Sequence, residues 1–219
     1  MTEQPRRYPI SLNLERLECV VVGAGRVGER KALGLVKAGA TPLVVGPRAA
    51  PGVLELASSG EIRLLQLEYR PELLQDASLV FAATDDPALN ARVAADARSV
   101  GALVNVADDP ARSDFANVGE IASGGVRITV STGGRSPAFA RALRKRLQAS
   151  LPVDLDVQLE HFERWRAEIE SRIESPEDRR LVWTELENRD LHAILDRHGP
   201  AAANRLVSKC IHAALGENE

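Results

Sequence analysis

The chain has 219 residues, of which 44% are hydrophobic and 27% charged, and its formal net charge is −3 at pH 7. These values are ordinary for a globular protein of one or two domains, and they argue against a general nucleic-acid-binding protein. No long apolar segment indicates a signal peptide or a membrane span, and the two cysteines, Cys19 and Cys210, have neither disulfide-framework nor metal-ligand spacing. We therefore expect a cytoplasmic protein with no membrane partner, no nucleic-acid partner and no metal site.

The first predicted element is a strand over residues 18–22 that leads into a glycine-rich turn. Glycines follow at positions 23, 25 and 28. Gly23 permits a tight turn, Gly25 lets a pyrophosphate approach the backbone, and Gly28 lets the next helix pack on the strand. A helix that begins at about Arg26 would direct N–H groups and its positive dipole end at the phosphates. The spacing predicts dinucleotide binding, and a turn that only packs is the alternative.

Strands and helices then alternate as far as Pro110. The predicted elements are a helix over 26–38, a strand over 41–46, a helix over 51–59, a strand over 62–67, a helix over 71–75, a strand over 78–83, a helix over 87–100 and a strand over 103–106. Alternation at such short intervals indicates right-handed βαβ units. We therefore predict an α/β fold with a Rossmann-like, doubly wound parallel sheet.

The pattern changes beyond Pro110. Two strands are predicted over 117–121 and 126–131, followed by helices over 137–150, 153–174, 176–188, 188–198 and 200–215. Five apolar residues share one face of the helix over 153–174 and should pack in a core: Leu155, Leu159, Phe162, Trp165 and Ile169. We therefore expect three parts, which are a nucleotide-binding domain over 1–112, a small α+β region over 113–151 and a helical domain over 152–219.

The end of the second predicted strand leaves the choice of coenzyme open. A dinucleotide-binding fold normally has an acidic residue there, which binds the ribose hydroxyls. This strand instead ends in Val45-Gly46-Pro47-Arg48, without a carboxylate. Arg48 could bind the 2′-phosphate of NADP or contact the adenosine half of NAD.

Four motifs occur in a fixed order along residues 8–152. They are Gly28-Glu29-Arg30-Lys31; Ala82-Ala83-Thr84-Asp85-Asp86 followed by Asn90; Asn105-Val106-Ala107-Asp108-Asp109-Pro110 followed by Phe115; and Ser131-Thr132-Gly133-Gly134-Arg135-Ser136-Pro137. Together they resemble the precorrin-2 dehydrogenase family of sirohaem biosynthesis. The resemblance implies NAD-dependent oxidation of precorrin-2 to sirohydrochlorin, with insertion of ferrous iron or cobalt as a further activity of some members. It also implies a homodimer that forms through the region 113–151.

The resemblance also implies roles for individual residues. Asp108 would be the catalytic carboxylate, although the neighbouring Asp109 leaves that assignment open. Asn105 would bind substrate. Contacts with NAD are implied for the glycine turn and for two further segments: Gly23, Gly25, Arg26, Val27, Gly28, Pro47, Arg48, Ala83 and Thr84.

A basic stretch offers a site for the carboxylates of a tetrapyrrole. Residues 135–149 contain five basic residues and no Asp or Glu, and the stretch opens at a predicted helix N-terminus. Arg135, Ser136 and Arg141 are the candidate substrate-binding residues. The remaining basic residues, Arg144, Lys145 and Arg146, are interpreted as a solvated helix face.

Two other functions are compatible with parts of this pattern. A nucleotide-sensing regulatory subunit of a transport system would also contain the glycine turn and a parallel sheet, but it usually has the acidic residue that is missing after Val45. A family member that retains only the chelatase activity is the second alternative. An absorption spectrum recorded with precorrin-2 and NAD would separate the three.

Overall fold

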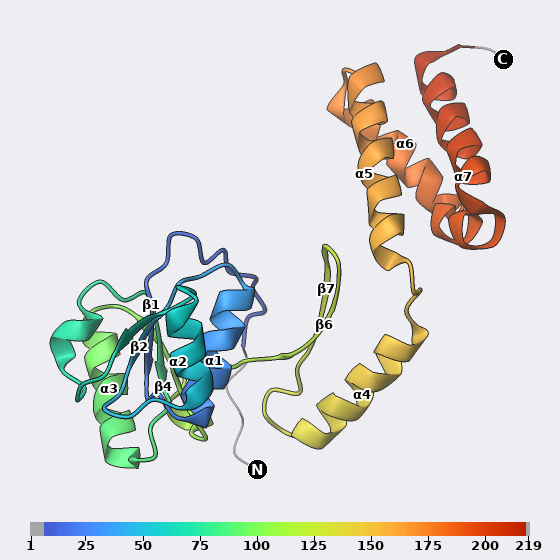
Figure 1. The fold of residues 1–219 in the computed structure, drawn as a ribbon. Helices are drawn as coiled ribbons and strands as arrows, with labels where there is room; N and C mark the ends of the chain where they lie inside the picture. Colours follow the sequence, from blue (N-terminus) through green and yellow to red (C-terminus); the bar gives the residue numbers. More distant parts are fainter. Residues whose placement is uncertain (1–6, 218–219) are drawn as a thin grey trace. The chain divides into compact units, whose positions relative to one another are not determined.

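The computed structural model describes residues 7–217 and divides them into two compact units. One unit contains the described residues up to Val118 together with Gly133–Ser136, and the other contains Gly119–Thr132 and the described residues from Pro137 onward (Figure 1). The predicted three-part division, with boundaries after residues 112 and 151, stays a prediction. Within residues 7–217, none of the helices has both the length and the apolar character needed to cross a bilayer.

The first unit contains a five-stranded parallel sheet, which confirms the predicted fold class. Its order is β3-β2-β1-β4-β5, so the strand order reverses beside β1. The strands are β1 (Cys19–Val22), β2 (Leu43–Val45), β3 (Arg63–Leu65), β4 (Leu79–Ala82) and β5 (Leu103–Val106). The connecting helices are α1 (Arg26–Lys37), α2 (Pro51–Ser58), the 3-10 turn η1 (Pro71–Leu74) and α3 (Pro87–Ser99), and the 3-10 turn η2 (Pro110–Arg112) follows β5. Ligands of such sheets bind where the order reverses, outside the carboxyl ends of the strands.

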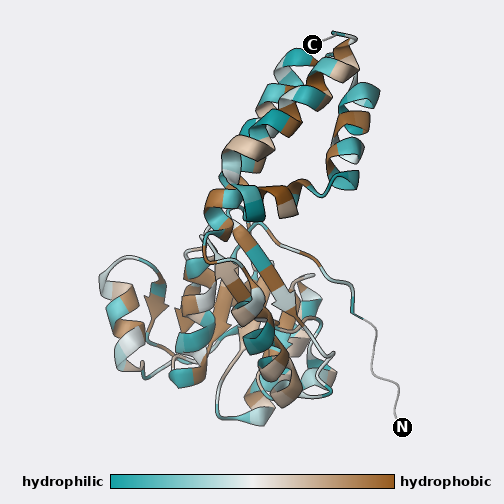
Figure 2. Ribbon diagram, turned by 90° about the vertical axis from the view of Figure 1, so that its right-hand side faces the viewer, coloured by the Kyte–Doolittle hydropathy of each residue, from teal (hydrophilic) through white to brown (hydrophobic). Residues whose placement is uncertain are grey.

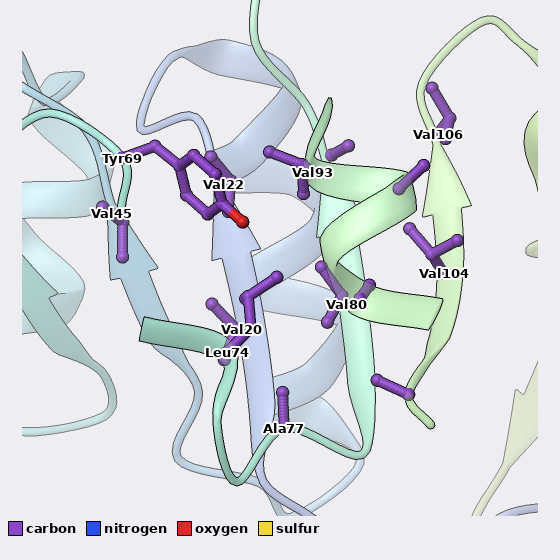
Figure 3. Close-up of a cluster of buried hydrophobic side chains, with 14 residues drawn as sticks. Val20, Val22, Val45, Tyr69, Leu74, Ala77, Val80, Val93, Val104 and Val106 are labelled. Atoms are coloured by element: carbon purple, nitrogen blue, oxygen red, sulfur yellow. The ribbon is translucent and has the colours of Figure 1, made fainter. Parts of the chain in front are cut away.

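Each face of this sheet is covered by its own hydrophobic cluster. Successive strand residues point to opposite faces, so Val20 and Val22 of β1 pack on one side and Val21 on the other. Figure 3 shows the first side, where Tyr69, just before η1, and Val93, on α3, lie against the valines of the strands. The second side packs against α1 and α2. Burial on both faces explains why the strands consist of continuous apolar runs.

The second unit combines a β-hairpin with four helices. Its elements are β6 (Gly119–Ser123), β7 (Val126–Val130), α4 (Pro137–Ser150), α5 (Leu155–Arg172), α6 (Pro176–Asn188) and α7 (Leu191–Leu215). The predicted strand over 117–121 is wrong by two residues, because Gly119 pairs with Val130 at the open end of the hairpin and Ser123 pairs with Val126 at the turn. The break predicted between helices at residue 199 is confirmed, since Gly199 has φ 75° and ψ 175° inside α7 and Pro200 follows it.

The predicted core face of α5 is confirmed at its centre. Trp165 is 3% exposed and Ile169 is fully buried, and Phe162 packs against the same cluster. The Trp165 indole N–H donates a hydrogen bond to Asn204 Oδ1, at 2.7 Å. Figure 2 shows hydrophobic and hydrophilic residues alternating along these helices, as expected where one face of each helix is buried.

Candidate functional site

The glycine turn brings the backbones of β1, α1 and β4 into direct contact. Gly23 has φ +112°, and a Cβ at this position would overlap the carbonyl of Ala83 and the amide of Thr84. A Cβ at Gly28 would overlap the carbonyl oxygen of Gly23. Both positions therefore require glycine, one for close approach to β4 and the other for the packing of α1 on the turn.

Gly25 differs, because the space above it is open. No described heavy atom lies within 4 Å of a Cβ built on Gly25. Gly25 is the N-cap of α1, and no described side chain caps this end of the helix. The first N–H groups of α1, beginning at the exposed Arg26 and the half-buried Val27, are therefore available to an anion. The turn fits the diphosphate of a dinucleotide.

The loop after β2 lies directly beside this turn. A Cβ on Gly46 would lie 2.9 Å from the backbone nitrogen of Ala24, and Ala50 N–H donates to the Ala24 carbonyl oxygen at 2.8 Å. Pro47 and Arg48 are both exposed. The structure thus places these two predicted coenzyme contacts next to the glycine turn, with an arginine where a carboxylate is usual.

Asn90 holds the segment after β4 through hydrogen bonds to a single residue. Its Oδ1 accepts from the Thr84 hydroxyl at 2.7 Å and from the Thr84 N–H at 3.1 Å, and its Nδ2 donates to the Thr84 carbonyl oxygen at 3.0 Å. Asn90 is 5% exposed. The sequence interpretation assigned Asn90 no role in the site, although it places Thr84 beside the glycine turn. The predicted cap at Asp86 is confirmed, since its carboxylate accepts from the N–H groups of Ala88 and Leu89.

Asp108 and Asp109 have different environments. Asp109 caps η2, because its carboxylate accepts from the Arg112 N–H at 3.1 Å and pairs with the Arg112 guanidinium at 3.3 Å. Asp108 is exposed, adopts φ 61°, and forms no side-chain hydrogen bond to any residue within 7–217. A left-handed residue other than glycine is uncommon and often marks a functional position. The geometry therefore leaves the Asp108 carboxylate available for chemistry and uses that of Asp109 locally.

Asn105 is buried and bonded at both ends of its amide. It is 7% exposed, its Oδ1 accepts from the Lys31 ammonium at 2.9 Å, and its Nδ2 donates to the Phe115 carbonyl oxygen at 2.9 Å. Its predicted contact with substrate stays a prediction, and the observed bonds fix the end of β5 that precedes Asp108. Lys31 had no predicted role, because its partner is 74 residues away in the sequence.

The basic residues predicted to bind substrate fall in both units. Arg135 is exposed and Ser136 is half-buried, and both belong to the first unit. Arg141 is exposed on α4 in the second unit, where Arg144 contacts the Glu120 carbonyl oxygen at 3.4 Å. A substrate role for Arg135, Ser136 and Arg141 stays a prediction.

Comparison with known proteins shows that the chain is similar to proteins named for sirohaem biosynthesis. Residues 10–118 match the family model described as "Putative NAD(P)-binding", and residues 124–150 match the model described as "Sirohaem biosynthesis protein central". The chain is 39% identical over 200 residues to Siroheme synthase 1 of Aeromonas salmonicida, and the alignment covers 91% of this chain and 43% of that protein. It is 37% identical over 196 residues to the siroheme synthase of Chromobacterium violaceum, and that alignment covers 89% of this chain and 42% of the relative. The chain thus spans less than half the length of these relatives.

A solved structure supports the fold independently. SirC, a precorrin-2 dehydrogenase, superposes with a TM-score of 0.71 at 21% identity, covering 93% of this chain and 98% of that chain. The chain therefore belongs to the family of the NAD(P)-binding and central modules of sirohaem synthases, the family that its four motifs resemble.

Proposed function

We propose that this chain oxidises precorrin-2 to sirohydrochlorin with NAD as the hydride acceptor. The observation that carries the proposal is the Asp108 carboxylate at the carboxyl end of β5, which has no hydrogen-bond partner among residues 7–217. It belongs to the same sheet whose β1 ends in the open turn at Gly25. The relatives named as sirohaem synthases and the fold of SirC support the choice of substrate.

The residues of the first unit would have distinct roles in binding the coenzyme and in proton transfer. The α1 N-terminus and Gly25 bind the diphosphate, and Pro47 with Arg48 contacts the adenosine half. Thr84, which Asn90 holds in place, would contact the nicotinamide. When bound, NAD accepts the hydride that leaves the macrocycle. Asp108 accepts the proton released in the same oxidation, so that two electrons and two protons leave precorrin-2.

Three further features extend the proposal. The chain works as a homodimer in the cytoplasm, and its central region forms the dimer contact. The exposed, positively charged Arg135 and Arg141, together with the Ser136 hydroxyl, bind acetate and propionate groups of the tetrapyrrole. Ferrous iron or cobalt enters sirohydrochlorin as a second substrate, with Asp108 accepting pyrrole protons.

The test measures sirohydrochlorin and NADH formation by absorbance with wild type, Asp108→Asn and Asp109→Asn. Wild type should form both products, Asp108→Asn should lose at least about 100-fold in kcat, because a general base typically contributes that much, and Asp109→Asn should retain activity with reduced stability. Wild type that leaves the precorrin-2 spectrum unchanged would favour a nucleotide sensor. Metal insertion without NADH formation would leave only the chelatase.

A further inference from the structure

Lys31 is a half-buried cation whose hydrogen-bond partners are all uncharged. Its ammonium donates to Asn105 Oδ1 at 2.9 Å and to Asn117 Oδ1 at 3.3 Å. The same ammonium lies 5.2 Å from the centre of the Phe81 ring. Within residues 7–217, no carboxylate forms an ion pair with Lys31. An ammonium has three N–H donors, so these two bonds leave one donor for another acceptor.

The surroundings make a bound anion favourable at this position. Burial, and then the charge of Arg30, lower the pKa of Lys31, whereas the nearby Asp108 raises it. Removing a cation from water without a neutralising charge is costly, and two neutral amides compensate for only part of that cost. The Lys31 ammonium also donates to Asn105, which lies three residues before the candidate catalytic Asp108, so Lys31 lies beside the end of β5 that leads to this carboxylate. An anion that reaches Lys31 would therefore be placed near Asp108.

We propose that Lys31 binds a carboxylate of the tetrapyrrole and thereby places the macrocycle beside Asp108, an inference that rests on the proposed function. Precorrin-2 carries several acetate and propionate groups, any of which can accept a charge-assisted hydrogen bond from an ammonium. Asn105 and Asn117 hold the ammonium in place before the substrate arrives, so little side-chain entropy is lost on binding. Phe81 adds an apolar surface beneath the charge.

The experiment is a spectroscopic titration of sirohydrochlorin into wild type, Lys31→Met and Lys31→Gln. Both variants remove the charge, and Gln retains hydrogen-bonding groups for the two asparagines. Their Kd for sirohydrochlorin should rise at least about tenfold, the cost of losing one hydrogen bond between charged groups. Raising the salt from about 0.05 M to about 0.3 M should weaken wild type more than the variants, because only wild type contains this charge.

Matched controls separate charge from packing. Lys37→Met removes an exposed lysine from the same helix and should bind like wild type. Asn117→Ala removes the longer of the two bonds that hold the ammonium but leaves its charge and its bond to Asn105, so its Kd should rise less than that of the Lys31 variants. The NAD affinity of each variant, measured separately, reports whether the first unit is folded.

Three results would overturn the inference. Lys31 variants that bind sirohydrochlorin as tightly as wild type, with the same salt dependence, would make Lys31 only a support for Asn105. An equal loss in Asn117→Ala would assign the effect to local packing. Wild type that binds neither sirohydrochlorin nor NAD would refute the proposed function and this inference together. Wild type that binds both ligands, with Lys31 variants of unchanged Kd for sirohydrochlorin, would refute the inference alone.

Discussion

Replacing Asn90 with leucine should destabilise the first unit and weaken coenzyme binding together. Asn90 is 5% exposed and forms three hydrogen bonds to Thr84. Leucine fills a similar volume but leaves the Thr84 N–H, hydroxyl and carbonyl without these partners. Each bond contributes about 0.5–1.5 kcal/mol, and the half-buried Thr84 regains some water, so we expect a loss of about 2–4 kcal/mol in the free energy of unfolding.

The measurement is urea unfolding followed by far-UV circular dichroism, with the NAD dissociation constant measured alongside. Tryptophan fluorescence serves as an internal reference, because Trp165 and Trp183, the two tryptophans of the sequence, lie on α5 and α6 in the second unit. Thr84→Val is the graded control. It leaves both backbone bonds to Asn90 and removes the hydroxyl, which also bonds the backbone N–H and carbonyl oxygen of Asp86, so it should cost about 1–2 kcal/mol.

The expected loss of coenzyme affinity follows from the position of Thr84. The Thr84 amide lies against Gly23, where even a methyl group would not fit. A shift of this peptide therefore also disturbs the glycine turn, and we expect a Kd for NAD about tenfold higher in Asn90→Leu, equivalent to about 1.4 kcal/mol. A loss of stability below about 0.5 kcal/mol, or an unchanged Kd in folded Asn90→Leu, would refute the reasoning.

Three further measurements test other parts of the first unit and the buried thiols. Gly28→Ala should weaken NAD binding and lower Tm, because its methyl group would overlap the Gly23 carbonyl oxygen; unchanged values in calorimetry would contradict this packing. Burial, and then the hydrogen bond to Asp96, raise the pKa of Tyr69. Its contribution to stability should therefore be complete below about pH 10 and be lost as the pH rises further, and urea titrations of Tyr69→Phe should lack this alkaline decline. Burial raises the pKa of the Cys19 and Cys210 thiols, so a thiol reagent should modify them slowly in native protein and rapidly in urea, and a fast native reaction would contradict their burial.

The helices of this fold were predictable because their ends are marked locally. Pro51, Pro87, Pro137 and Pro176 each stand at the first position of a helix, where a missing N–H costs nothing. Strand ends lack such markers. The strand predicted over 62–67 is only Arg63–Leu65, because it pairs on one side with the three residues of β2 and lies at the edge of the sheet. Strand length is thus set by the partner strand, which a local pattern does not contain.

The site divides in the same way between local and distant interactions. The glycine spacing was readable because one turn and one helix end produce it. The roles of Asn90 and Lys31 depend instead on which residues lie opposite them after folding. A polar residue within an apolar helix face, such as Asn90 among the buried Val93, Ala94 and Ala97 of α3, is the signal that could have found the first. Lys31 gives no such signal, since an exposed lysine on α1 would have the same pattern.

The sequence alone does not distinguish Asp108 from Asp109 as the candidate catalytic carboxylate. The two residues differ in backbone conformation, which an Asp-Asp pair does not determine. The left-handed φ of Asp108 costs about 1 kcal/mol or more, and the following residues supply interactions that offset this cost. Asp109 caps η2, and the Ser113 hydroxyl accepts from the Val106 N–H at 2.9 Å and donates to the Asp109 carbonyl oxygen at 2.8 Å. Asp114 also accepts from the Val104 N–H at 3.0 Å. These bonds hold the backbone on both sides of Asp108, while its exposed carboxylate forms no side-chain hydrogen bond within residues 7–217. The general base that we propose at this position must reach a substrate proton, and an exposed carboxylate on a held backbone meets that requirement.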